Sequence, residues 1–216
     1  MPRILCYGDS NTWGYATAPR PDGRYADHER WPCVMGAVLG KDWTVIEEGL
    51  NGRTTVHADP IEGMWLDGSS SFTPILRSHM PLDAVAIMLG TNDLKARFSV
   101  GPFDIASGIG VLLRQLQRAE AGRNAGVPKA IVVCPPPILA TFGAFDFFGE
   151  MLAGGHEKSL RLAPYYRTTA AELGAAFLDA GTVIKSSSYD GIHLDPDMQD
   201  QLGKAIAGVV KGLAIG

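Results

Sequence analysis

The stretch Ala84-Val85-Ala86-Ile87-Met88-Leu89 is apolar throughout and ends at Gly90. An unbroken apolar run of this length, without polar alternation, predicts a strand that is buried on both faces. Strands of that kind belong to parallel sheets, because the helical connections between parallel strands cover both sides of the sheet. This segment therefore favours an α/β fold built around a parallel sheet.

Four further segments of similar character recur along the chain at about forty-residue intervals. They are residues 3–8, 43–50, 130–135 and 175–180, which with 84–90 make five predicted strands. Helical periodicity lies between and after them, most clearly over residues 105–116 and 198–213. The alternation predicts a single domain over residues 1–216, a three-layer α/β/α sandwich with a flavodoxin-like, five-stranded parallel sheet.

Composition and charge exclude several classes of protein. The 216 residues include 19 Lys or Arg and 23 Asp or Glu, giving a net charge of −4. This balance lacks the basic patch of a nucleic-acid binder or of a protein that binds anionic membranes. The apolar runs are shorter than the roughly 18 residues of a membrane span, and the N-terminus lacks a signal-peptide pattern. We therefore expect a cytoplasmic protein with neither nucleic acid nor membrane as a partner.

Cysteines and histidines give no sign of a metal site. Cys6, Cys33 and Cys134 are odd in number and form no CxxC pair, so we expect free, buried thiols. The five histidines show no HxxxH or HExxH spacing. We expect His193 to have a chemical role, and the others to occupy surface or loop positions, with His57 and His156 as candidates for lining a pocket.

Polar segments follow the predicted strands. Right-handed connections place the carboxyl ends of parallel strands at one edge of a sheet, and ligands bind outside that edge. The segments expected there are Gly8-Asp9-Ser10-Asn11, Asn51-Gly52-Arg53-Thr54, Gly90-Thr91-Asn92-Asp93 and Asp190-Gly191-Ile192-His193.

Ser10 is the candidate nucleophile among these residues. A serine in this position is also a common helix N-cap, so it gains meaning only with a base and a group that orients the base. Asp190 and His193 are three residues apart, close enough for the carboxylate to hold Nδ1–H while Nε2 points outward. The alternative for this pair is a turn carboxylate that caps the helix beginning near Pro196.

An acyl-transfer intermediate also needs preorganised donors for its negatively charged oxygen. Ser10 N–H, Gly52 N–H and Asn92 Nδ2 are the candidate donors of this oxyanion hole. Asp9 and Asp93 are expected to shape the same loops by accepting backbone hydrogen bonds. The chemistry requires no metal and no organic cofactor.

Together, the four segments resemble the ordered blocks of the SGNH, or GDSL, hydrolases. The resemblance spans residues 8–193 and implies an α/β/α sandwich with five parallel strands. At matching positions it implies Ser10 as nucleophile, His193 as base and Asp190 as its partner, with Gly52 and Asn92 as oxyanion donors. No G-x-S-x-G sequence occurs, which argues against the elbow of the α/β-hydrolases.

A narrower resemblance is to the bacterial arylesterase, acyltransferase and perhydrolase subgroup. It is carried by residues 4–14 (ILCYGDSNTWG), 47–55 (EEGLNGRTT) and 87–93 (IMLGTND). It implies an intracellular homo-oligomer that can pass an acyl group to an alcohol or hydrogen peroxide as well as to water. Asn11 replaces the leucine of the family motif, and Gly52 stands where the subgroup often has alanine. Both departures leave the preference between hydrolysis and acyl transfer open.

Residues beside the blocks are candidates for substrate binding. Trp13, Asn51 and Ile192 are the residues expected to contact the substrate. The aromatic segment 142–148 either roofs the pocket, contacts a neighbouring subunit or packs in the core, and the same alternatives apply to Trp65 and Phe72.

The sequence therefore predicts a serine esterase that hydrolyses short-chain acyl esters of aryl or simple alkyl alcohols through an acyl-enzyme. The alternative enzyme is a carbohydrate O-acetylesterase with the same triad. A flavodoxin-like binding module is the alternative from another class, because Ser10, Thr12 and Thr17 faintly resemble a hydroxyl-rich phosphate loop. That alternative leaves the polar residues after the other strands unexplained.

Overall fold

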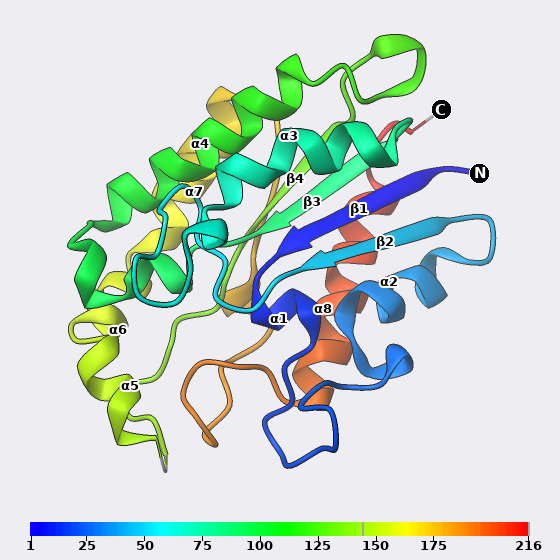
Figure 1. Ribbon diagram of the computed structural model, residues 1–216. Coiled ribbons are helices and arrows are strands. Elements are labelled where there is room, and N and C mark those ends of the chain that lie inside the picture. The colour runs from blue at the N-terminus through cyan, green and yellow to red at the C-terminus, as the bar shows by residue number, and fades with distance from the viewer. Residues whose placement is uncertain (144, 216) are drawn as a thin grey trace.

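Five parallel strands form one sheet in the order β2-β1-β3-β4-β5 in the computed structural model, which describes residues 1–143 and 145–215 (Figure 1). The strands are β1 (Arg3–Gly8), β2 (Thr44–Gly49), β3 (Ala84–Met88), β4 (Lys129–Cys134) and β5 (Ala176–Asp179). Each lies within two residues of its predicted bounds. This strand order is the flavodoxin-like one, so the predicted fold class is confirmed.

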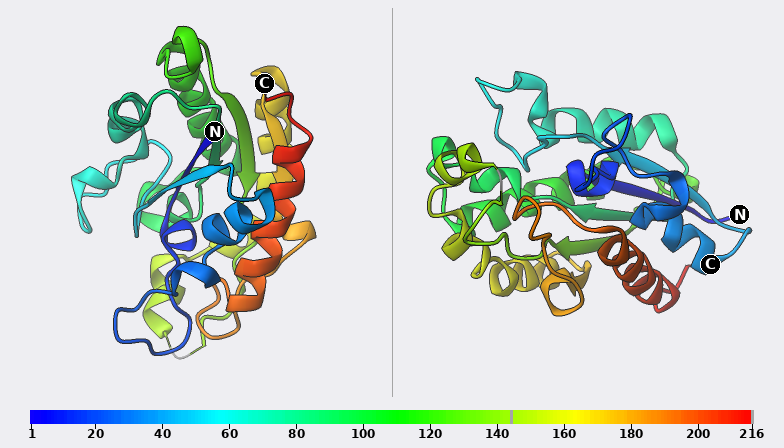
Figure 2. Two further views of the ribbon diagram at one scale, coloured as in Figure 1. Left: turned by 90° about the vertical axis from the view of Figure 1, so that its right-hand side faces the viewer. Right: turned by 90° about the horizontal axis from the view of Figure 1, so that it is seen from below.

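Helices cover both faces of the sheet. They are α1 (Ser10–Trp13), α2 (Trp31–Leu39), α3 (Gly68–His79), α4 (Pro102–Arg118), α5 (Asp146–Met151), α6 (Gly155–Ser159), α7 (Leu162–Glu172) and α8 (Pro196–Lys211). Figures 1 and 2 show α2 and α8 on one side of the sheet and α3 and α4 on the other. The two predicted helices correspond to α4 and α8.

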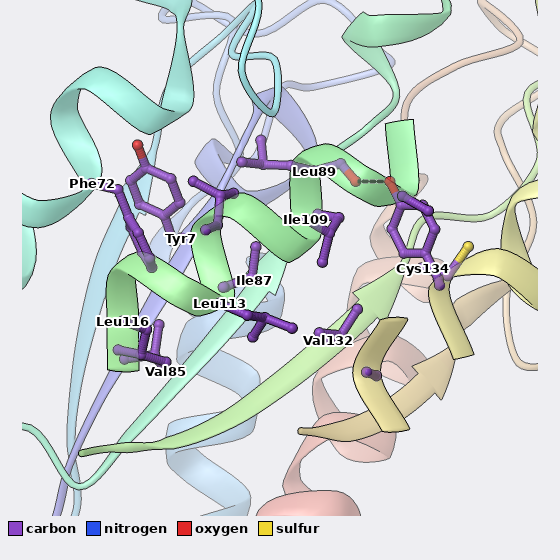
Figure 3. Close-up of a cluster of buried hydrophobic side chains, with 14 of the residues drawn as sticks. Tyr7, Phe72, Val85, Ile87, Leu89, Ile109, Leu113, Leu116, Val132 and Cys134 are labelled. Atoms are coloured by element: carbon purple, nitrogen blue, oxygen red, sulfur yellow. Dashed lines mark hydrogen bonds between the residues drawn. The ribbon is translucent and has the colours of Figure 1, made fainter. Parts of the chain in front are cut away.

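The strands divide their side chains between two hydrophobic clusters. Ile4 and Cys6 of β1 pack with α2 and α8, whereas Leu5 and Tyr7 pack with α3, α4 and α7. This division follows from the pleat, which points successive side chains to opposite faces. Figure 3 shows the second cluster, where Tyr7 and Phe72 meet side chains of β3 and α4. Burial on both faces explains why the strands lack polar alternation.

The prediction of free, buried thiols is confirmed for two of the three cysteines. Cys6, Cys33 and Cys134 are all free, and Cys6 and Cys134 are buried. Cys33 is partly exposed, contrary to the prediction, because it lies on α2 with its Sγ 3.4 Å from Glu47 Oε1 instead of inside the sheet. Within the part of the chain that the structure describes, no helix combines the length and apolarity needed to cross a membrane.

Two glycines allow α1 to pack directly on the carboxyl ends of the first two strands. A Cβ at Gly8 would lie 2.0 Å from Thr12 Oγ1, and a Cβ at Gly49 would lie 2.2 Å from the Trp13 backbone nitrogen. Any larger residue would push α1 away from the sheet. The chain therefore turns from β1 into Ser10 at the point where the sheet's connections change direction, which is where such folds bind ligands.

Candidate active site

Ser10 is the first residue of α1 and is nearly buried, with 7% of its surface exposed. Asp9 caps this short helix, because its Oδ1 accepts a hydrogen bond of 3.0 Å from the Asn11 N–H. Asp9 thus shapes the loop by accepting a backbone hydrogen bond. Ser10 itself is left free to present its hydroxyl to another segment.

The partner of Ser10 is His193, from the loop before α8. His193 Nε2 lies 2.9 Å from Ser10 Oγ, and His193 Nδ1 lies 2.7 Å from Asp190 Oδ2. Asp190 Oδ1 accepts the backbone N–H groups of Ile192 and His193, each at 2.9 Å. The serine, imidazole and carboxylate form one continuous hydrogen-bonded chain.

The ionisation of Asp190 fixes the roles within this chain. Burial opposes the charged form, but the hydrogen bond from the His193 ring and the two backbone N–H groups outweigh it and lower the pKa of Asp190. An ionised carboxylate can only accept, so the ring proton of a neutral His193 resides on Nδ1. The lone pair of Nε2 then faces Ser10 Oγ, which is the arrangement of a general base and its nucleophile.

The His193 ring is held from two directions. Tyr15 stacks against it with ring centroids 4.1 Å apart and an interplanar angle of 24°. Gly191 has a φ of +75°, and a Cβ there would lie 2.5 Å from the Thr141 carbonyl oxygen, so the turn between Asp190 and His193 requires glycine. The contact of Tyr15 was not predicted, because no pattern in the sequence relates it to His193.

Two of the three candidate oxyanion donors, Gly52 and Asn92, come from the turns after β2 and β3. Gly52 has a φ of +83°, a conformation that favours glycine. Asn92 Nδ2 donates to the Arg53 carbonyl oxygen at 3.1 Å, which leaves the second hydrogen of its amide group for another acceptor. This bond ties the two turns together.

Asp93 provides a second tie between the same turns. It is fully buried and accepts hydrogen bonds from Thr55 N–H and Thr55 Oγ1, the latter at 2.5 Å. His57 Nδ1 lies 3.0 Å from Asp93 Oδ1, and this hydrogen bond raises the pKa of His57. Asp93 therefore shapes the loops, and His57 is its partner.

A cavity of about 170 Å³ opens at these residues. Ser10, His193, Gly52 and Asn92 all line it, as do Asn51 and Ile192, two of the three residues expected to contact substrate. The structure thus brings segments from four separate loops to one space.

Trp13, the third of those residues, does not line this cavity. Its ring packs against the Arg24 guanidinium, whose central carbon lies 4.9 Å from the ring centroid. The helix α1 ends at Trp13 and is capped by Gly14, which has a φ of +89°, so the chain turns away after a single helical turn. Trp13 therefore lies outside the cavity lining, and its contact with substrate stays a prediction.

The aromatic segment contributes part of the cavity wall. Phe148 lines the cavity with Met151 and Leu152, whereas Phe142 packs against the core and Phe147 is 59% exposed. Position 144 lies outside the described residues. Phe72, on α3, is fully buried in the core. Trp65 is 68% exposed.

A charged cluster, formed by Asp59, Glu62, Lys95 and Arg97, lies at the same cavity and was not predicted. Lys95 Nζ is 2.8 Å from Glu62 Oε2 and 3.2 Å from Asp59 Oδ2. Burial opposes the charge on Asp59, but backbone N–H groups and the Lys95 ammonium lower its pKa to about 2. A buried lysine gives no signal in the sequence, because lysine is ordinarily exposed and its partners lie on another loop.

The hydroxyls that suggested a phosphate loop do not converge. Thr17 Oγ1 donates to Asp195 Oδ1 at 2.6 Å, and Ser10 Oγ faces His193. The Thr12 hydroxyl is buried behind Gly8. Each hydroxyl has a different neighbour, which argues against the binding-module alternative.

Comparisons with known proteins show what the chain as a whole is similar to. The sequence profile of the GDSL-like Lipase/Acylhydrolase family matches residues 6–201. A solved aryl esterase from M. smegmatis is 42% identical, with a TM-score of 0.91 over 99% of this chain and 100% of that one. A carbohydrate acetylesterase from Sinorhizobium meliloti is 39% identical, with a TM-score of 0.91 over 98% of this chain and 99% of that one. The comparison with curated proteins gave no match.

The buried carboxyl of Asp9 generates a prediction about stability and pH. Burial raises the pKa of Asp9 to about 6, above its ordinary value of 3.8. The folded protein therefore binds the proton of the Asp9 carboxyl more tightly than the unfolded chain does. Protonated Asp9 stabilises the folded state below about pH 4, and this stabilisation is lost as the pH rises through 6. Between pH 4 and 7.5, the unfolding free energy of wild type should fall by about 2 kcal/mol relative to Asp9→Asn.

Urea denaturation across this pH range measures the difference, with the exposed Asp42→Asn as the control for loss of a carboxylate as such. A difference between wild type and Asp9→Asn that does not change with pH would contradict the prediction.

Proposed function

This chain belongs to the GDSL-like lipase/acylhydrolase family, a family of ester hydrolases, and we propose that it cleaves short-chain acyl esters of aryl or simple alkyl alcohols. The observation that carries the proposal is the hydrogen-bonded chain from Ser10 Oγ through His193 to Asp190. In this chain a base lies within reach of a hydroxyl, and a carboxylate holds the base in the required tautomer.

The proposed reaction has two steps. His193 Nε2 takes the proton of Ser10 Oγ as that oxygen attacks the acyl carbon, and Asp190 stabilises the resulting imidazolium. The imidazolium then gives the proton to the departing alcohol oxygen, which leaves an acyl group on Ser10. Water attacks this acyl-enzyme with His193 as base again, and the released acid regenerates the serine.

Three donors would hold the negative charge that develops on the former carbonyl oxygen. They are the Ser10 N–H, the Gly52 N–H and the free hydrogen of Asn92 Nδ2. Each comes from a different loop, and the hydrogen bond from Asn92 to Arg53 fixes two of these loops together. Donors fixed before the reaction stabilise the charge without reorganising.

The form of the cavity supports small substrates. A space of about 170 Å³ lies below the roughly 300–1,000 Å³ of pockets that hold drug-sized ligands, which suits a small ester. Phe148, Met151 and Leu152 give it an apolar wall, which suits a short acyl chain or an aryl ring. The 42% identity to an aryl esterase supports the same substrate class.

The apolar wall also supports acyl transfer. An apolar wall favours binding of an alcohol that carries hydrocarbon, and such an alcohol then competes with water for the acyl-enzyme. Hydrogen peroxide is a further acceptor that we propose on the resemblance alone. Hydrolysis and transfer then compete for one intermediate, with His193 as base in both.

A carbohydrate O-acetylesterase is the second candidate function. The observation that favours it is that two charged residues, Glu62 and Lys95, line the cavity together with the apolar residues. The solved carbohydrate acetylesterase at 39% identity supports it as well.

Replacement of the nucleophile tests the proposal directly. Ser10→Ala should lower kcat on phenyl acetate by at least about 10³-fold, because the acyl-enzyme can no longer form. A fluorophosphonate probe should label wild type and the exposed-serine control Ser78→Ala equally, and should not label Ser10→Ala. Labelling that persists in Ser10→Ala would overturn the assignment of the nucleophile.

Acyl transfer has a separate test. Purified protein given phenyl acetate and excess benzyl alcohol in buffer should release benzyl acetate as well as acetic acid, measured by chromatography. A Ser10→Ala sample corrects for uncatalysed exchange. Acetic acid as the sole product would rule out transfer and would leave hydrolysis intact.

A further inference from the structure

The proposed mechanism uses the two nitrogens of His193 but not the face of its ring. Tyr15 lies against that face, with ring centroids 4.1 Å apart and an interplanar angle of 24°. His193 is only 8% exposed, and Tyr15 lines the same cavity beside it. An aromatic ring therefore takes the place of water over one face of a nearly buried base.

Backbone hydrogen bonds fix Tyr15 relative to the nucleophile. The Tyr15 N–H donates to the Ser10 carbonyl oxygen at 2.9 Å, and Tyr15 forms an isolated antiparallel bridge with Arg24. Gly14, with its φ of +89°, makes the turn that leads from α1 into this bridge. The short helix that presents the Ser10 hydroxyl thus also sets the position of the Tyr15 ring.

The stacked pair gains importance because His193 changes its charge during the proposed reaction. The ring is neutral before Ser10 attacks and becomes an imidazolium once it holds the serine proton. A cation within about 6 Å of the centre of an aromatic ring is attracted by the electron-rich face, and exclusion of water strengthens the attraction. The distance of 4.1 Å and the burial of His193 meet both conditions. Asp190 binds the same ring at its edge, so the two contacts do not compete.

We propose that the face of the Tyr15 ring stabilises the imidazolium form of His193 and so lowers the barrier to ester cleavage. Tyr15 is a positioning residue in this proposal, because it acts through His193 and not on the substrate. The proton concerned is the one that His193 takes from Ser10 and returns to the departing alcohol. The same attraction favours protonated His193 in the free enzyme. This inference rests on the proposed esterase function.

Removal of the aromatic ring tests both consequences. Tyr15→Leu should lower kcat/KM on phenyl acetate about fivefold, and should move the acidic midpoint of the pH profile of kcat/KM down by about 0.7 pH units. Tyr15→Phe keeps the electron-rich face and should restore both values. Phe103→Leu removes an exposed aromatic ring on α4, away from the site, and should change neither value.

A series of rings of nearly equal shape separates stabilisation of the charge from packing. Phenylalanines with increasing numbers of ring fluorines, incorporated in place of Tyr15, have progressively less electron-rich faces. The acidic midpoint should fall stepwise along this series, because the attraction for the imidazolium weakens. Charged groups of the elements around His193 also influence the midpoint, but they are the same in every variant and cancel in the differences; they are Asp190, Asp9, Asp195, Glu62 and Lys95.

NMR titration of the His193 ring measures the same midpoint without substrate. Folded wild type that fails to cleave phenyl acetate would refute the esterase function, and the NMR midpoints would still show whether Tyr15 stabilises the charged ring. The inference is overturned if Tyr15→Leu keeps the wild-type midpoint, or if the midpoint stays constant along the fluorinated series, whatever happens to kcat/KM.

Discussion

One carboxylate oxygen of Asp190 accepts a hydrogen bond from His193 Nδ1–H. The other accepts hydrogen bonds from two backbone N–H groups. This small set of bonds keeps the carboxylate ionised, fixes the tautomer of the ring and points Nε2 at Ser10. Chemistry at Ser10 depends on it, because a ring with its proton on Nε2 could not accept the proton of the serine hydroxyl. The turn at Gly191 and the stacked Tyr15 serve the same end by fixing the ring's position.

The sheet places the groups of the site within hydrogen-bonding distance of one another. Ser10 follows β1 and Asn92 follows β3, and these two strands are neighbours although they are far apart in sequence. Gly8 and Gly49 bring α1 down onto the strand ends, while Asn92 and Asp93 bind the turn after β2. The close packing of α1 on the strand ends and the hydrogen bonds between the turns therefore hold the groups of the site in position together.

The sequence was most informative where burial or backbone geometry dictated the residue. Strands covered on both faces, such as β3, are apolar without alternation, so their positions could be predicted, and topology then placed Ser10, Asn92 and His193 at one edge. Contacts of Glu62 and Lys95 depend on the path of the loop between β2 and α3, which no periodicity specifies. The packing of Trp13 against Arg24, outside the cavity lining, likewise depends on loop geometry that no sequence pattern specifies. The subunit number and cellular location stay predictions.

The role of His193 as the base is tested most directly by locating its ring proton in solution. Nitrogen-15 NMR of the labelled protein, at a pH where the ring is neutral, distinguishes the two ring nitrogens. If His193 is the base for Ser10, the proton lies on Nδ1, in a strong hydrogen bond that is lost in Asp190→Asn, and Nε2 is unprotonated. A proton on Nε2 in wild type, with Nδ1 free, would contradict it, because His193 could not then act as the base for Ser10.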